Sequence, residues 1–116
     1  MTERPGSRRF ARFPAALPLT ARAAQFRQTD LRGIVLDIGA GGVMAEFPVQ
    51  IVAGSSLRFV IHARSGTLQK EGTVVWTDLL EGRVRHGIAF LNPEDPQFAV
   101  NLSGATPSPR RSGPWP

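Results

Sequence analysis

Short apolar stretches, separated by glycine, proline and polar turns, run along most of the chain. Several of them alternate apolar and polar residues with a period of two, which is the pattern of a β-strand with one buried face. SLRFVIHA, at residues 56–63, is the clearest example. The pattern predicts six strands, at residues 15–23, 31–38, 42–47, 56–63, 67–78 and 83–91. Their regular spacing favours a small all-β domain, either an antiparallel barrel or a sandwich.

Three local signals refine this pattern. Pro18 cannot donate a backbone hydrogen bond, so the first strand is expected at the edge of the sheet. Gly72, inside the fifth strand, indicates a β-bulge. After the last strand, residues 93–102 are expected to form one short helix, with Asn92 as its N-cap and Pro93 at its first position.

The two ends of the chain differ in composition from the middle. Residues 1–13 form a basic arm that is too polar to be core, and it contains four arginines, Arg4, Arg8, Arg9 and Arg12. Residues 103–116 are basic and rich in proline and serine, which is typical of a disordered tail. The folded domain is therefore expected over residues 14–102.

Length and composition limit the class of protein. A chain of 116 residues is long enough for one small domain with a single core. It contains no cysteine, which excludes disulfides, thiolate chemistry and cysteine-ligated metals. No apolar stretch approaches the roughly 20 residues that span a membrane, and the N-terminus lacks the apolar segment of a signal peptide. We therefore expect a cytoplasmic protein.

The charge of the chain indicates an anionic partner. The net charge is +5, with 13 arginines and a single lysine. Guanidinium groups form paired hydrogen bonds with phosphates and guanine edges, and they stack on flat rings. A general nucleic-acid-binding barrel would also carry such a charge. The chain has few aromatic residues and no tyrosine, which argues against nucleic acid, because single strands stack on aromatic side chains.

Catalytic chemistry finds little support in the sequence. His62 and His86 are isolated on predicted strands, and no nucleophile or metal-ligand spacing accompanies them. They are interpreted as structural histidines. The acidic residues are scattered, apart from the neighbours Glu94 and Asp95. We therefore expect no enzyme, no metal site and no cofactor.

The segment LDIGAGGVMAEF, residues 36–47, is the most glycine-rich part of the chain. A dinucleotide-binding G-x-G-x-x-G motif would need a third glycine where Met44 stands, and a helix after it. A phosphate-binding Walker loop would need a Gly-Lys-Ser/Thr ending, which is missing. The residues that follow alternate like a strand, so the segment is interpreted as a turn between two strands.

Arginines ahead of the first strand, followed by an Asp–Gly turn after the second, resemble the PilZ domain family of bacterial cyclic di-GMP receptors. The family carries R-x-x-x-R on an arm before its barrel, and RRFAR matches with Arg8 and Arg12. It also carries [D/N]-x-S-x-x-G at a strand end, and DIGAGG matches with Asp37 and Gly42. Gly39 stands where the family usually has serine. The segments VVW and HGIAFL also look like later strands of the family, so the resemblance covers residues 7–102.

The resemblance implies a six-stranded antiparallel β-barrel of split-barrel type with a short C-terminal helix. It also implies a function without catalysis: binding of cyclic di-GMP, and transmission of the signal to a downstream protein when the N-terminal arm rearranges. The loss of the serine hydroxyl at Gly39 leaves an alternative open. The chain would then be a degenerate PilZ-like module that contacts another protein and does not bind the nucleotide.

The resemblance also implies a role for each residue of the ligand site. Arg8, Arg9 and Arg12 would contact phosphates and guanine edges. Asp37 would accept hydrogen bonds from guanine N1–H and N2–H₂. Three glycines belong to the same turn, and those at 41 and 42 would allow a positive φ and a close approach of the backbone: Gly39, Gly41 and Gly42. Trp76 is expected either as a core or rim aromatic or beside a base of the ligand.

Overall fold

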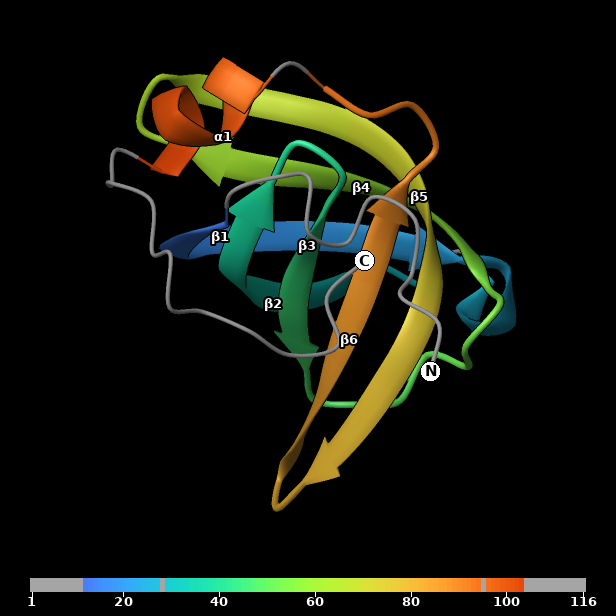
Figure 1. Ribbon diagram of the computed structural model, residues 1–116. Coiled ribbons are helices and arrows are strands. Elements are labelled where there is room, and N and C mark those ends of the chain that lie inside the picture. Colours follow the sequence, from blue (N-terminus) through green and yellow to red (C-terminus); the bar gives the residue numbers. More distant parts are fainter. Residues whose placement is uncertain (1–11, 28, 95, 104–116) are drawn as a thin grey trace, which may run out of the picture.

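The computed structural model describes residues 12–27, 29–94 and 96–103, which form a barrel and one helix (Figure 1). The strands of this part are β1 (Phe13–Ala23), β2 (Leu31–Gly39), β3 (Gly42–Phe47), β4 (Ser56–Ala63), β5 (Gly66–Leu80) and β6 (Arg83–Phe90). A short 3₁₀ helix, η1 (Ala24–Phe26), follows β1, and α1 (Pro96–Ser103) follows β6. The strands close in the order β1-β2-β3-β6-β5-β4, and all neighbours are antiparallel. The predicted all-β class, the barrel and the short C-terminal helix are confirmed.

The prediction that β1 lies at an edge is wrong, because β1 pairs with β2 on one side and with β4 on the other. Pro18 is tolerated because it pairs only with Ile34 of β2. Pairing with β4 begins one residue later, at Leu19. The missing N–H of the proline therefore falls just outside the second ladder, and the barrel closes around it.

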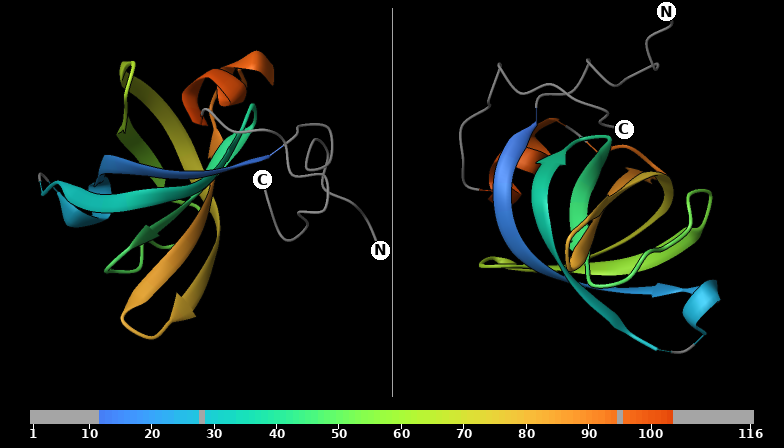
Figure 2. Two further views of the ribbon diagram at one scale, coloured as in Figure 1. Left: turned by 90° about the vertical axis from the view of Figure 1, so that its left-hand side faces the viewer. Right: turned by 90° about the horizontal axis from the view of Figure 1, so that it is seen from below.

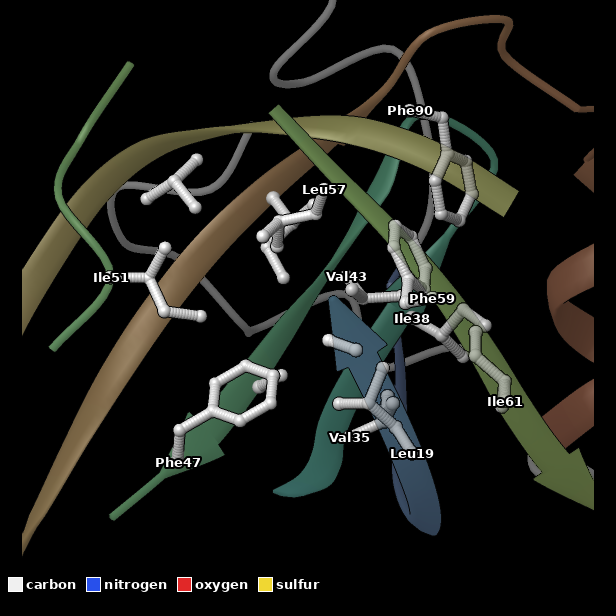
Figure 3. Packing of buried hydrophobic residues seen from close by; sticks show 14 of the residues in the cluster. Leu19, Val35, Ile38, Val43, Phe47, Ile51, Leu57, Phe59, Ile61 and Phe90 are labelled. Carbon is white, nitrogen blue, oxygen red and sulfur yellow. The ribbon is translucent and has the colours of Figure 1, made fainter. Parts of the chain in front are cut away.

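Apolar side chains from all six strands point inward and form one core (Figure 3). Phe59 of β4 stacks with Phe90 of β6 at a centroid distance of 6.1 Å. Phe98 of α1 meets the ring of Phe90 edge-on at 5.8 Å, and Ala99 beside it is fully buried. The helix therefore extends the core at one end of the barrel. Figure 2 shows that η1 lies far from α1, at the opposite side of the molecule.

The helix α1 begins at Pro96, later than predicted, and Asn92 is not its N-cap. The segment after β6 makes other contacts. Lys70 Nζ donates to the carbonyl of Asn92 (3.3 Å) and to the carboxylate of Glu94 (2.5 Å). The Glu94 N–H donates to the carbonyl of Ala40 (2.8 Å). These contacts hold the segment on a non-helical path, although the helix still opens on a proline.

Gly72 does not form a bulge, in contrast to the prediction, because it pairs regularly with Leu57 of β4 and Phe90 of β6. A Cβ atom at this position would lie 2.4 Å from the carbonyl oxygen of Ala89. Glycine is therefore required by the close approach of β6. The bulge of β5 lies further along, at Val75, since the pairing with β6 is irregular beside this residue.

Two bulges determine which side chains face outward. In β2 the pairing with β3 passes from Val35 directly to Asp37, so Leu36 is an extra residue. In β5 the pairing with β6 passes from Val74 directly to Trp76. An extra residue shifts the alternation of a strand by one position. Without these bulges, alternation would place Asp37 and Trp76 on the same side as the core residues Val35 and Val74.

Candidate functional site

One row of residues crosses five strands on the outer face of the barrel. The ladders pair Pro14 with Asp37, Asp37 with Met44, Met44 with Gly87, and Gly87 with Trp76. Residues directly opposite each other in a sheet share a face. Met44 alternates with core residues of β3, so all five residues belong to the outer face. We call these five residues the outer row. It brings Asp37 and Trp76, which lie far apart in the sequence, onto one surface.

The indole of Trp76 lies against the bare backbone of Gly87. A Cβ atom at Gly87 would be 2.1 Å from Nε1 of Trp76 and 2.3 Å from its Cε2. The ring therefore crosses β6 toward Met44, and Trp76 is not a core residue. Within the described residues, the indole N–H is buried and makes no hydrogen bond. This side chain offers a flat apolar ring, and its buried N–H becomes a donor for a ligand only if the ring shifts.

Asp37 is 2% exposed, although it belongs to the outer face. Strand neighbours in a sheet are about 4.8 Å apart, so the backbones of Asp37 and Trp76 are separated by roughly 14 Å across three ladders. The indole covers part of this distance because it lies over β6. The spacing therefore suits a planar ligand of moderate size, which would reach Asp37 only after the groups around this side chain move.

The glycine turn joins β2 to β3 as a two-residue hairpin, because Gly39 pairs with Gly42 and leaves Ala40 and Gly41 between them. The turn is anchored to the end of β6. The Phe90 N–H donates to the Gly41 carbonyl (2.9 Å), and Ala40 accepts from the backbone of the segment after β6. The turn therefore has a fixed position at the end of the barrel where α1 lies (Figure 1).

The expected positive φ at Gly41 and Gly42 is wrong. Among the described residues, the glycines with a positive φ are Gly54, Gly66 and Gly82. The expected close approach of this backbone to a ligand stays a prediction, but Gly42 does lie close to β6: a Cβ atom there would be 2.1 Å from the carbonyl oxygen of Ile88. Gly42 is therefore needed for the packing of β3 on β6.

Of the predicted arginines, Arg12 lies within the described residues and is half-buried. It directly precedes Phe13, which pairs with Ile38 of β2. Arg12 therefore lies beside the end of β2, next to the glycine turn. Arg8 and Arg9 lie outside the described residues, so their predicted roles stay predictions.

A charged cluster lies one step further along β3 and β6, on the same face as the outer row. Glu46 and Arg85 are direct partners across the two strands. The Glu46 carboxylate accepts hydrogen bonds from Nε of Arg85 (2.8 Å) and Nε of Arg83 (3.1 Å). Burial alone would raise the pKa of Glu46, but the hydrogen bonds and charges of the two arginines lower it. The sequence analysis missed these residues, although the alternation of RVRHG places both arginines on the face of Gly87.

His86 is a structural residue, as interpreted from the sequence. It is fully buried, its Nε2 accepts a hydrogen bond from the Ile51 N–H (2.9 Å), and Phe47 packs edge-on against its ring. Burial lowers the pKa of His86, and the backbone carbonyls of Val84 and Ala45 oppose this only in part. The neutral imidazole therefore belongs to the folded barrel.

We expect the stability of the barrel to decrease as the pH falls below about 6.5, the ordinary pKa of histidine. The folded-state pKa of His86 is lower than this value, so the unfolded chain takes up the proton first as the pH falls. The contribution of the neutral histidine to the free energy of unfolding is therefore fully present only above that pH. His86→Gln retains an acceptor for the Ile51 N–H and has no titrating group, so the decrease should disappear. Urea unfolding between about pH 5.5 and 7.5 measures this effect.

The matched control for this prediction is His62→Gln, because His62 is exposed and lies on the outer face beside Thr20. This variant should keep the pH dependence of the wild type. An equal decrease in wild type and His86→Gln would show that another group is responsible.

Two features are absent from the described residues. None of the helices in this part is long and apolar enough to cross a membrane. The same residues contain no group of three or more histidine, cysteine or acidic side chains that could hold a metal ion.

Solved structures of other proteins share this fold. The PilZ domain of YcgR from Escherichia coli, solved with cyclic di-GMP, superposes with a TM-score of 0.64 at 18% identity, over 82% of this chain and 85% of that one. The inhibitor of motility MotI from Bacillus subtilis gives a TM-score of 0.63 at 19% identity. This match covers 89% of the present chain, which spans about half (49%) of MotI. The PilZ domain of CeSA from a cellulose-synthesizing bacterium gives 0.54 at 16% identity, over 80% of this chain and 95% of that one.

The structural likeness concerns the fold, since the identities are low. Comparison with curated protein sequences gave no match. Comparison with protein-family models gives the decisive result, because the PilZ domain matches residues 7–102, which include the arginine motif, the glycine turn and all six strands. The chain therefore belongs to the PilZ domain family.

Proposed function

We propose that this chain is a cyclic di-GMP receptor of the adaptor type, which passes the signal to a partner protein when its N-terminal arm rearranges. The observation that carries this proposal is the outer row. It places the carboxyl side chain of Asp37 and the indole of Trp76 on one surface, with Arg12 at the adjoining strand end. A PilZ domain of similar fold is solved with the same nucleotide.

The chemistry of these side chains fits a guanine nucleotide. The Asp37 carboxylate accepts hydrogen bonds from guanine N1–H and N2–H₂, whereas adenine has no N–H at its N1. The indole of Trp76 provides a stacking face for a base. Arg8, Arg9 and Arg12 form paired hydrogen bonds with phosphates or with the O6/N7 edge of guanine.

The burial of Asp37 supports a rearrangement on binding. This side chain is on the outer face and only 2% exposed, so the groups around it have to move before a base reaches the carboxylate. The proposed rearrangement of the N-terminal arm rests on charge, because its four arginines, Arg4, Arg8, Arg9 and Arg12, repel one another without an anion. Ordering a residue costs roughly 1–2 kcal/mol of backbone entropy, so several strong contacts to the ligand are needed to offset it.

The alternative, a PilZ-like module without nucleotide binding, rests on Gly39 alone. The absent serine hydroxyl removes one neutral hydrogen bond, worth about 0.5–1.5 kcal/mol. A change of this size weakens binding several-fold and does not abolish it. Gly39 is also outside the group of glycines with a positive φ, so the turn has an ordinary backbone there.

Calorimetric titration of the full chain with cyclic di-GMP tests the proposal. GTP and a short single-stranded oligonucleotide are the controls, and only cyclic di-GMP is expected to saturate. Amide hydrogen exchange of residues 3–13 should become slower in the same complex. Absence of binding would overturn the proposed function, while binding with unchanged exchange would overturn the arm movement.

A further inference from the structure

A groove of about 450 Å³ runs from η1 and the end of β1 across β4 to β5 and Leu91. Its walls include Arg22, Arg27, Arg58, Glu71 and Leu91. Arg22 is eight residues along β1 from Pro14 of the outer row, a distance of about 25 Å at 3.3 Å per residue. The glycine turn lies near α1, whereas η1 lies at the opposite side of the molecule (Figure 2). The arginine end of the groove is therefore distant from the outer row, whereas its other end, at Thr73, lies three residues along β5 from Trp76.

Two arginines of the groove, Arg22 and Arg58, form only weak, solvent-exposed ion pairs. Arg22, Arg58 and Glu71 are direct neighbours across β1, β4 and β5. Arg22 pairs through Nε with Asp30 (2.5 Å), and Arg58 lies 3.5 Å from the carboxylate of Glu71. The two arginine side chains are 63% and 75% exposed. Ion pairs in such positions contribute little to stability, so these arginines can exchange one carboxylate for another at small cost.

Arg27 has a backbone conformation that favours glycine. Its φ of 54° and ψ of −120° are those of the first central residue of a type II′ turn. A hydrogen bond from the Thr29 N–H to the Phe26 carbonyl (3.1 Å) closes this turn. Among the described residues, Arg27 is the only non-glycine residue with a positive φ. A side chain held in such a strained conformation indicates a function that glycine could not fulfil.

We propose that the groove is a docking site for an acidic segment of a partner protein. Carboxylates of the segment would pair with Arg22, Arg27 and Arg58, and an apolar side chain would cover Leu91, which is 65% exposed. An extended segment suits the site better than a small anion, because the arginines come from two strands and a turn. A single exposed ion pair contributes little binding free energy, whereas several ion pairs to one peptide segment give a larger combined contribution. The proposal does not depend on nucleotide binding.

The test uses the full chain, without nucleotide, and the acetylated peptide Glu-Glu-Glu-Leu-Glu-Glu-Glu. Amide chemical shifts are followed by NMR at about 0.1 M ionic strength, where exposed charges more than about 10 Å apart are screened. The shifts should cluster on the groove, at Ser56, Arg58, Thr73 and Leu91. Arg27→Gly should weaken peptide binding at least threefold and raise the melting temperature, because glycine relieves the strained turn.

Arg64→Ala is the matched control, since it removes the same charge from the exposed turn between β4 and β5, outside the groove. Its peptide affinity should stay within twofold of the wild type. Arg58→Ala leaves the turn intact and should weaken the peptide as Arg27→Gly does. Shifts confined to residues 1–12 or to the outer row would overturn the proposal. So would equal peptide affinity in Arg27→Gly, Arg58→Ala and Arg64→Ala.

Discussion

Replacing Arg8 or Arg12 with alanine is expected to weaken cyclic di-GMP binding at least tenfold. Each variant removes a charge-assisted hydrogen bond, worth about 1.5–3 kcal/mol, and about 1.4 kcal/mol corresponds to a factor of ten. The melting temperature should change by only a few degrees, because Arg12 does not belong to the apolar core of the described residues and Arg8 belongs to the polar arm of the sequence. Calorimetric titration gives the affinity, and thermal unfolding gives the stability.

Two further variants separate geometry from charge. Arg12→Lys keeps the positive charge and loses the planar pair of donors, so its affinity should lie between those of the wild type and Arg12→Ala. Arg64→Ala lowers the net charge equally and should bind like the wild type. Wild-type affinity in both Arg8→Ala and Arg12→Ala would show that the ligand site is elsewhere.

The strands were predictable because alternation is a local property of the sequence. All six predicted strands exist, and their ends differ from the prediction by at most a few residues. The errors occur where contacts between residues far apart in the sequence determine the local structure. The carboxylate of Glu94 is held by Lys70 from another strand, and this delays the start of the helix. Pro18 indicated that β1 lies at the edge of the sheet, but β4 pairs with β1 from the next residue, Leu19, onward.

The residues of the candidate site were predictable from the motifs, but their arrangement was not. Leu36 and Val75 are ordinary apolar residues in apolar runs, and nothing in the sequence marks them as bulges. Each bulge nevertheless reverses the side on which the next residue lies. The position of Asp37 and Trp76 in one row of the same face also depends on the register of three strand pairs. Such a register follows from the closure of the whole barrel.

Gly87→Ala is expected to weaken cyclic di-GMP binding about as much as Trp76→Ala. The new methyl group would lie 2.1 Å from Nε1 of Trp76, so the indole has to leave its place on β6. Stacking of a base on an aromatic side chain is worth about 1–3 kcal/mol, which corresponds to a loss of roughly five- to more than one-hundredfold. In a Trp115→Phe background, Trp76 is the only tryptophan. Its fluorescence should shift to longer wavelength when Gly87→Ala exposes the ring to water.

The double variant Gly87→Ala/Trp76→Ala separates this mechanism from general damage to the barrel. If the alanine acts only by displacing the indole, the double variant should bind no more weakly than Trp76→Ala alone, because the two effects share one cause. Trp76→Phe keeps an aromatic ring and should retain most of the affinity. A displaced, water-exposed indole in Gly87→Ala together with wild-type affinity would show that Trp76 does not contact the ligand. The outer row would then bind the nucleotide through Asp37 without a stacking partner from β5.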